Sequence, residues 1–266
     1  MASSHAPVAA NVEPMSEAEQ RTRQDLAALY RLVDHHGWTD LIYNHISAKI
    51  PGEPGAYLVN PYGLLYEEVT PDNLVKVALD DGAILDADPT AQTNVAAHDL
   101  HAPVLAARDD LQCLAHVHTP AIMAVSAMAQ GLLPITQTAM GFAGRLGYHD
   151  YGFGGDACER LVRDFEGKDT VVLRNHGVMI AGQTIAEAYV QLHNFQMACE
   201  AQVMLLAAGD KLAYPPQAIL EGQAKGFGPW LDRKQGPRDP AGCLEWDAAL
   251  RMLARKGINF HERSET

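Results

Sequence analysis

The chain has 266 residues, of which 47% are hydrophobic, and this is enough for a sizeable core in one large domain or two small ones. It carries 20 Lys and Arg against 33 Asp and Glu, a formal net charge of -13. Such a balance leaves little material for a cationic face, so nucleic acid and anionic membranes are not expected as partners. A small molecule is the expected partner.

The first predicted helix begins at Ser16. Before it, Met1–Pro14 is rich in Ala, Ser and Pro and has no basic end followed by an apolar run. We therefore expect it to be neither a signal peptide nor a membrane anchor, and we expect residues 1–15 to form a disordered tail. Ser16-Glu17-Ala18-Glu19 reads as a capping box, and apolar residues then recur at helical spacing up to Gly37.

Strands are predicted next, over 41–50 and 55–59. Asp80-Asp81-Gly82, between apolar runs at 75–79 and 84–85, predicts a hairpin with a type I′ turn. The remaining predicted helices are 93–107, 120–129, 155–165, 184–208 and 241–255, and the remaining extended segments are 112–118, 132–136 and 170–174.

These elements predict a three-layer α/β/α fold with a largely antiparallel central sheet, because the strands join through hairpins. We expect a single domain over residues 16–266, with a C-terminal helical extension. The apolar runs are shorter than the roughly 20 residues that cross a bilayer. The four cysteines form neither a CxxC pair nor a disulfide framework, so a cytoplasmic protein is expected.

The strongest chemical signal is the pair His116 and His118 in a predicted strand. Side chains two residues apart in a strand point to the same side, so both imidazoles can bind one ion. His176 follows another apolar run and can complete a three-histidine face with a position left open for substrate. The alternative is that these histidines are ordinary packed residues.

In four segments the chain resembles the class II aldolase/adducin family, over about residues 20 to 210. The matching segments are Asn44-His45-Ile46-Ser47-Ala48-Lys49, Leu58-Val59-Asn60-Pro61-Tyr62-Gly63, Ala115-His116-Val117-His118-Thr119 and Arg174-Asn175-His176-Gly177. The resemblance implies that His116, His118 and His176 bind a divalent metal, Zn2+ or Mn2+. It also implies an α/β/α fold and a homotetramer with active sites at subunit boundaries.

The chain departs from the sugar-phosphate aldolases of that family. Ala97 stands where they carry a glutamate that binds metal and moves protons, and Thr138 is near the position of their catalytic tyrosine. Tyr62 and Val95-Ala96 replace small hydroxyl residues that hold the substrate phosphate. Desolvating a phosphate without donors is costly, so an unphosphorylated substrate is expected.

We therefore expect a metal-dependent carbon–carbon lyase acting on a small carboxylate or carbonyl compound through a metal-stabilised enolate. The leading hypothesis is a decarboxylase of a hydroxy-aromatic or β-keto/hydroxy carboxylate, similar to the hydroxypyridine and hydroxyphthalate decarboxylase branch. The first alternative is a retro-aldolase on an unphosphorylated hydroxy-ketone or hydroxy-acid. A non-enzymatic, adducin-like assembly module is the second.

Other residues receive roles within this hypothesis. His101, and after it His98, is the candidate acid that protonates the carbanion, unless both are packed helix residues. Tyr148, in a polar cluster with His149, is a third catalytic candidate, with a subunit contact as the alternative. The resemblance implies that the substrate is contacted by Asn44, His45, Ser47, Tyr62 and Gly63.

Overall fold

The centre of the fold is a seven-stranded mixed sheet, seen in a computed structural model that describes residues 15–86, 90–150, 152, 156–209, 211–222 and 243–261. Neighbouring strands are antiparallel except β5 and β6, which are parallel. In sheet order the strands are β3 (Val75–Ala78), β2 (Glu53–Val59), β1 (His45–Ile50), β4 (Cys113–Val117), β7 (Gly177–Gly182), β6 (Thr170–Leu173) and β5 (Leu146–His149).

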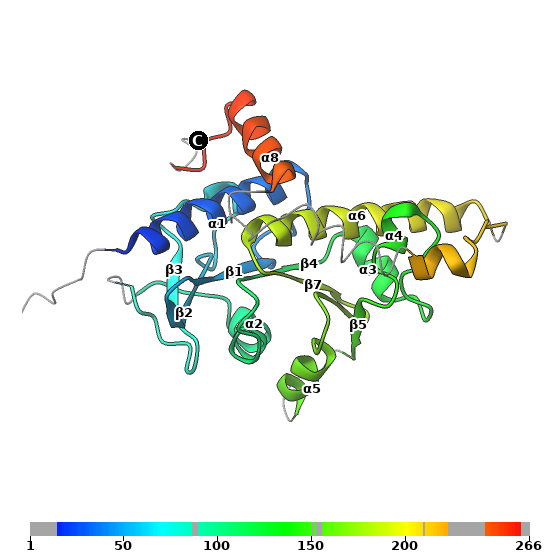
Figure 1. Ribbon diagram of the computed structural model, residues 1–266. Helices are drawn as coiled ribbons and strands as arrows, with labels where there is room; N and C mark the ends of the chain where they lie inside the picture. The colour runs from blue at the N-terminus through cyan, green and yellow to red at the C-terminus, as the bar shows by residue number, and fades with distance from the viewer. Residues whose placement is uncertain are drawn as a thin grey trace, which may run out of the picture.

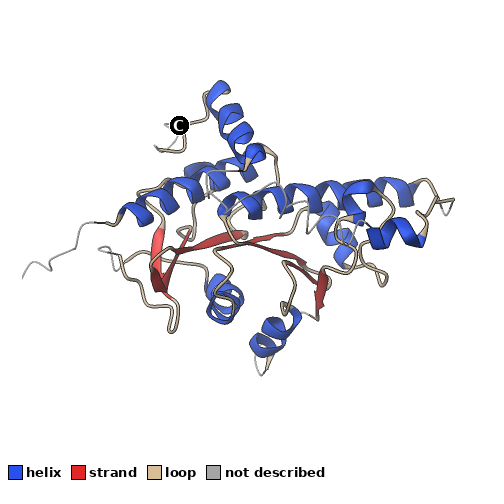
Figure 2. Ribbon diagram, in the orientation of Figure 1, coloured by secondary structure: helices blue, strands red, loops and turns tan. Residues whose placement is uncertain are grey.

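Helices cover both faces of this sheet, as Figures 1 and 2 show. One face carries α1, α6 and the short helices α3 and α4, with α8 packed on α1 and α6, and the other face carries α2 and α5. Their bounds are α1 (Glu17–His35), η1 (Tyr66–Glu68), α2 (Val95–Ala107), α3 (Pro120–Ser126), α4 (Gln137–Met140), α5 (Ala157–Asp164), α6 (Ile185–Ala207) and α8 (Leu244–Arg255). The predicted α/β/α fold with a largely antiparallel sheet is confirmed.

Strand alternation divides the core into two clusters. Ile46 of β1 and Ala115 of β4 pack toward α1 and α6, whereas Leu114 belongs to the cluster under α2 and α5. His45, Ser47 and the residue opposite His45, His116, therefore project from the α2 face. Strands β1 and β4 therefore carry polar side chains on a buried face of the sheet, and the candidate site lies on that face.

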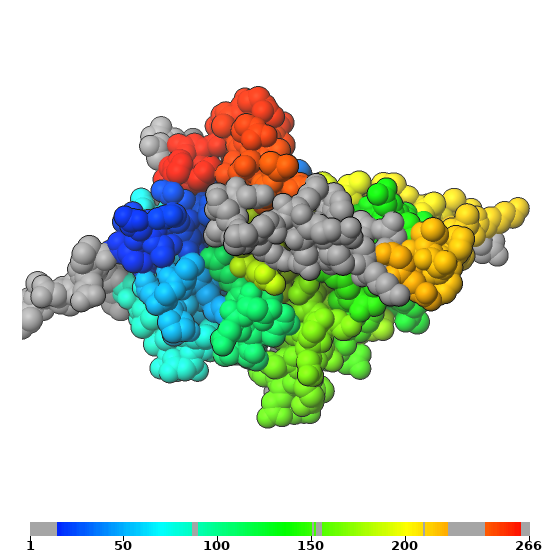
Figure 3. All heavy atoms as spheres, in the orientation of Figure 1, coloured from blue at the N-terminus to red at the C-terminus, as the bar shows by residue number. Residues whose placement is uncertain are grey.

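Helix capping follows the sequence signals. The Ser16 hydroxyl accepts a hydrogen bond from the Glu19 amide, and the Thr184 hydroxyl accepts one from the Glu187 amide at the start of α6. The predicted C-terminal helix is α8. In the space-filling view it protrudes from the surface (Figure 3).

Several predicted elements differ from the observed ones. The strand predicted from Leu41 begins only at His45, because Leu41 has a positive φ of 45° inside a turn. Residues 132–136 are not a strand and lead into α4, while β5 and β7 were not predicted. The hairpin after β3 forms through a Val77–Ile84 bridge, but Gly82 alone among Asp80, Asp81 and Gly82 has positive φ, so the turn is not type I′.

The predicted disordered tail, at residues 1–15, lies outside the described residues except for Met15. The glycine-rich segment 152–155 is described only at Gly152. No helix in the described ranges has the length and the apolar character needed to cross a bilayer.

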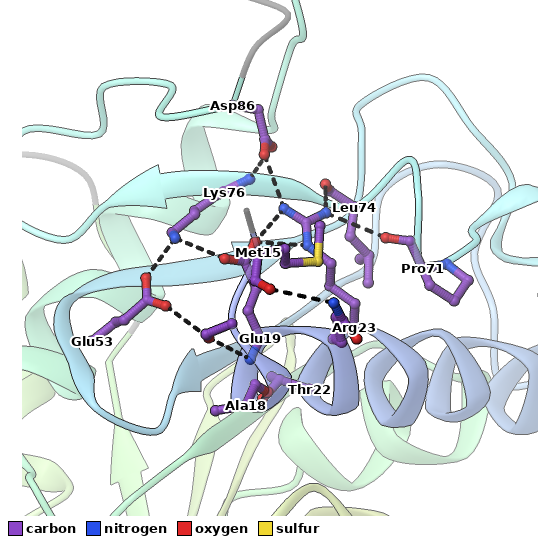
Figure 4. A network of polar contacts seen from close by, with 12 residues as sticks. Met15, Ala18, Glu19, Thr22, Arg23, Glu53, Pro71, Leu74, Lys76 and Asp86 are labelled. Atoms are coloured by element: carbon purple, nitrogen blue, oxygen red, sulfur yellow. Dashed lines mark hydrogen bonds and ion pairs between the residues drawn. The ribbon is translucent and has the colours of Figure 1, made fainter. Parts of the chain in front are cut away.

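A buried ion network joins α1 to the edge of the sheet (Figure 4). The Arg23 guanidinium, 4% exposed, pairs with Glu19 at 2.8 Å and Asp86 at 2.9 Å and donates to the carbonyl of Leu74 at 2.6 Å. Lys76 of β3 pairs with Glu19 at 2.9 Å. The two cations hold the pKa of Glu19 below its usual value although burial acts in the opposite direction.

Candidate metal centre

His116 and His118 come from the end of β4. His116 is buried opposite His45 of β1, and His118 immediately follows the last residue of the strand. Their ring centroids lie 5.2 Å apart. The two-residue spacing therefore does what the sequence predicted and brings both imidazoles to one side.

His176 reaches the same place from the turn between β6 and β7. Asn175, just before it, has a φ of 59°, and the His176 amide donates to the carbonyl of Leu173 at 3.1 Å. Its ring centroid lies 4.9 Å from that of His116 and 5.5 Å from that of His118. One nitrogen from each of the three residues lies within 4.8 Å of the other two.

The triad presents its imidazoles in the form that binds a metal. His116 Nδ1 donates to the carbonyl of Val178 at 3.0 Å, and His118 Nδ1 donates to the carboxylate of Asp40 at 2.8 Å. Both contacts leave Nε2 for an ion. Burial lowers the pKa of His116 well below its ordinary value and that of His176 to about 4, so these rings are uncharged at neutral pH.

Burial also lowers the pKa of His118, although the Asp40 carboxylate partly opposes this effect. Three neutral imidazoles match the protein donor set of a catalytic zinc site, which binds the metal through three side chains. The residues therefore fit a divalent cation, and their assignment as its ligands stays a prediction.

Gly177 allows the turn to approach β4 closely. A Cβ at this position would lie 2.7 Å from the carbonyl oxygen of Val117 and 3.1 Å from the Cβ of His118. We expect Gly177→Ala to lower stability by about 1–3 kcal/mol, or about 3–10 °C in melting temperature, and to weaken metal binding. The measurement is thermal unfolding of the metal-free protein followed by metal titration.

Gly55→Ala is the matched control, because a Cβ there meets nothing within 4 Å. A Gly177→Ala protein that melts and binds metal like the control would contradict the close approach.

Asp40 is a charged side chain in contact with the triad that the sequence reasoning missed. It lies in the loop between α1 and β1, and its neighbour Leu41 is, with Asn175, one of two non-glycine residues with positive φ in the described ranges. Both flank the triad, and strained residues of this kind concentrate at functional sites. The strained Leu41 is a structural observation, and no sequence motif marks it.

We expect Asp40→Ala to lower metal affinity by about 10–100-fold, because partners that orient a ligating imidazole contribute about this much. A competition titration against a chelator measures the change. Asp72→Ala, at an exposed loop position, is the control and should bind metal like the unaltered protein. Equal affinity in all three proteins would remove Asp40 from the site.

His45, Ser47 and His101 are brought together beside the triad. His45 Nδ1 lies 2.9 Å from His101 Nε2, and His101 Nδ1 lies 2.6 Å from the Ser47 hydroxyl. His101 is fully buried, with His45 between it and the triad: the ring of His45 lies 4.8 Å from that of His116. His101 is thus placed behind His45 and not at the open side of the site.

The other two catalytic candidates have contacts elsewhere. His98 Nδ1 lies 3.1 Å from the Tyr57 hydroxyl, and its ring lines the space beside Gly82. The Tyr148 hydroxyl accepts a hydrogen bond from the Leu132 amide at 3.1 Å, and the Arg174 guanidinium lies 4.3 Å over its ring. Neither has a contact with the triad among the interactions of the described residues, so the structure does not bring them to the site.

The remaining substrate candidates lie at the same end of the sheet. Asn44 is buried, its amide nitrogen donates to the carbonyl of Trp38 at 3.1 Å, and its Oδ1 has no partner among the described residues. Tyr62 and Gly63 follow the end of β2, which is paired with β1, and Tyr62 is 42% exposed. Tyr62 is therefore available to a ligand, while the Asn44 amide nitrogen supports the loop that carries Asp40.

Residues 24–203 match the model of the class II aldolase and adducin N-terminal domain. The chain therefore belongs to this family, and its fold is that of a superfamily of metal-dependent lyases that also includes the adducins.

Individual relatives agree with this. The chain is 40% identical to a Caulobacter vibrioides protein provisionally named as a class 2 aldolase, over 92% of this chain and 94% of that protein. The crystal structure of an aldolase II superfamily protein from Pseudomonas syringae superimposes with a TM-score of 0.83 at 38% identity, covering 93% of this chain and 98% of that one. Alpha-adducin of Rattus norvegicus is 40% identical over 91% of this chain, which spans only 34% of the adducin.

Proposed function

We propose that this protein is a divalent-metal-dependent carbon–carbon lyase, and that it decarboxylates an unphosphorylated hydroxy-aromatic or β-keto/hydroxy carboxylate. The observation that carries the proposal is the convergence of His116, His118 and His176, two of them with Nδ1 held by a hydrogen-bond acceptor. A bound Zn2+ or Mn2+ would supply Lewis-acid stabilisation of negative charge on a substrate oxygen.

The start of α2 supports an unphosphorylated substrate. The first turn of α2 holds Val95 and Ala96 in place of hydroxyl side chains, and the Asn94 side chain already accepts the Ala96 amide at 3.0 Å. A phosphate at this helix end would have to displace that cap. The buried Ala97 side chain offers no acid or ligand.

The chain's own polar groups supply the rest of the chemistry. Tyr62, which follows β2 at the end of the sheet that carries the triad, is 42% exposed and can stack on a flat substrate. His45 is a further polar side chain next to the triad, with its ring 4.8 Å from that of His116. These groups suit a planar oxygen-rich substrate.

Two other functions stay as alternatives. A retro-aldolase on an unphosphorylated hydroxy-ketone or hydroxy-acid uses the same stabilisation of an enolate and differs only in the fragment that leaves. An adducin-like assembly role is favoured by the 40% identity to alpha-adducin. We also propose a cytoplasmic homotetramer. The exposed methionines Met123, Met197 and Met204 of α3 and α6 are candidate subunit contacts.

The deciding experiment incubates Zn2+- and Mn2+-loaded protein with a panel of hydroxy-aromatic carboxylates, β-keto acids and hydroxy-acids. Release of carbon dioxide supports decarboxylation, and release of an aldehyde supports the retro-aldolase. His118→Ala protein treated in the same way is the control for metal-catalysed background. A protein that binds no metal and turns over nothing supports the assembly role.

A further inference from the structure

A chain of three buried polar side chains ends at the candidate metal centre. Ser47 and His101 are fully buried and His45 is 2% exposed. They are linked by hydrogen bonds of 2.6 Å from Ser47 Oγ to His101 Nδ1 and 2.9 Å from His101 Nε2 to His45 Nδ1. A buried polar network of this kind destabilises the folded protein unless each group has a hydrogen-bond partner. Its position beside the triad therefore suggests a functional role.

The hydrogen-bonded side chains Ser47, His101 and His45 lead toward the triad. His45 is paired with His116 across β1 and β4, and their rings lie 4.8 Å apart. Because Nδ1 of His45 is bonded to His101, the free edge of the ring carries Nε2, which has no hydrogen-bond partner among the described residues. A substrate oxygen at the open side of the triad is the partner this nitrogen can meet.

The hydroxyl of Ser47 fixes the direction of the hydrogen bonds. Its proton has one acceptor among the described residues, His101 Nδ1. If His101 Nδ1 carried the proton instead, the buried hydroxyl proton of Ser47 would have no acceptor, at a cost of about 1–3 kcal/mol. Ser47 therefore donates to His101, His101 Nε2–H donates to His45 Nδ1, and the remaining His45 proton sits on Nε2.

Resting on the proposed function, we propose that His45 is a catalytic residue that serves as an uncharged Nε2–H hydrogen-bond donor to the substrate oxygen on which negative charge develops. Ser47 and His101 are positioning residues that act through it. No proton is transferred by His45 in this role. A preorganised donor aimed at developing charge in a buried site is among the largest contributions to catalysis.

The electrostatic surroundings agree with neutral rings. Burial lowers the pKa of His101 to about 3. It also lowers the pKa of His45 well below the ordinary value, and His101, His118 and His176 act in the same direction. A neutral imidazole donates one proton and keeps it, as the proposed role requires.

The first test reads the tautomers directly. Nitrogen-15 NMR of the full-length, metal-free protein with labelled histidine should show His45 and His101 protonated at Nε2 and not at Nδ1. In Ser47→Ala the bias is removed, and we expect a mixture of both tautomers. A His45 that carries its proton on Nδ1 in the unaltered protein would overturn the proposal, whether or not the protein proves to be a lyase.

The second test uses acetohydroxamate, a planar metal-chelating anion, as the probe for the metal-loaded protein. His45→Gln keeps an N–H donor and should bind the probe within about 3-fold of the unaltered protein, whereas His45→Phe should bind about 10-fold more weakly. Both variants should hold the same amount of metal as the unaltered protein. His98→Phe, which changes a histidine of α2 whose hydrogen bond goes to Tyr57, is the matched control and should bind normally.

Two results would contradict the role of His45. Loss of metal from His45→Phe would make His45 a ligand, and unchanged probe binding by that variant would remove it from the site. A protein that binds no metal at all would defeat the proposed function, while the tautomers in the metal-free protein would still decide the hydrogen-bond chain.

Discussion

His116→Ala and His118→Ala should each lose metal and lose all of the proposed lyase activity while the fold survives. A structural zinc site in a peptide contributes about 10–16 kcal/mol over four ligands, so one imidazole is worth roughly 3 kcal/mol, or about 100-fold in affinity or more. Both residues lie at the end of a strand whose other side chains stay packed. Metal content after gel filtration, with circular dichroism and thermal unfolding, measures both effects.

His98→Ala is the matched control, because His98 is a partly buried histidine of α2 whose hydrogen bond goes to Tyr57. It should retain metal and activity. Full activity in either triad variant, or loss of metal in the control as well, would refute the assignment of the metal ligands.

Arg23→Ala should lower the free energy of unfolding by about 3–5 kcal/mol. The change removes the cation that pairs with the buried Glu19 and with Asp86, and it leaves the carbonyl of Leu74 without that donor. Lys76 still pairs with Glu19, which favours the lower part of the range. Urea unfolding, followed by circular dichroism, measures the loss.

Arg21→Ala is the control for this second prediction. Arg21 lies on the same helix and pairs with Glu17 at 2.9 Å, but their side chains are 74% and 87% exposed. Surface pairs one helical turn apart contribute about 0.3–0.5 kcal/mol, so the control should unfold nearly like the unaltered protein. Similar losses in both variants would mean that burial of the Arg23 network contributes little.

Local signals explain the elements that were predicted well. The Ser16 and Thr184 caps, the apolar periodicity of α1 and the short, mostly apolar run of β4 each depend on residues a few positions apart. The short strands β5 and β7 were missed because their sequences, such as Leu146-Gly147-Tyr148-His149, have no strong alternation. In the structure β5 pairs with β6, and β7 pairs with both β4 and β6.

Leu41 illustrates the opposite failure. It continues the apolar pattern of β1, and the sequence therefore predicted a longer strand. In the structure it turns with positive φ and places Asp40 against His118. The strand propensity of this segment therefore counted for less than a contact between Asp40 and His118, which are far apart in the sequence.

The sequence by itself determined the histidines available to a metal, since His116 and His118 share a side by strand geometry and His176 follows a second strand. The tertiary structure alone decided that Asp40 orients His118 and that His45 stands between His101 and the triad. It also decided that His98 and Tyr148 make their contacts elsewhere. The physical reason is that spacing along a strand fixes direction, whereas which side chains meet depends on how separate strands and loops pack.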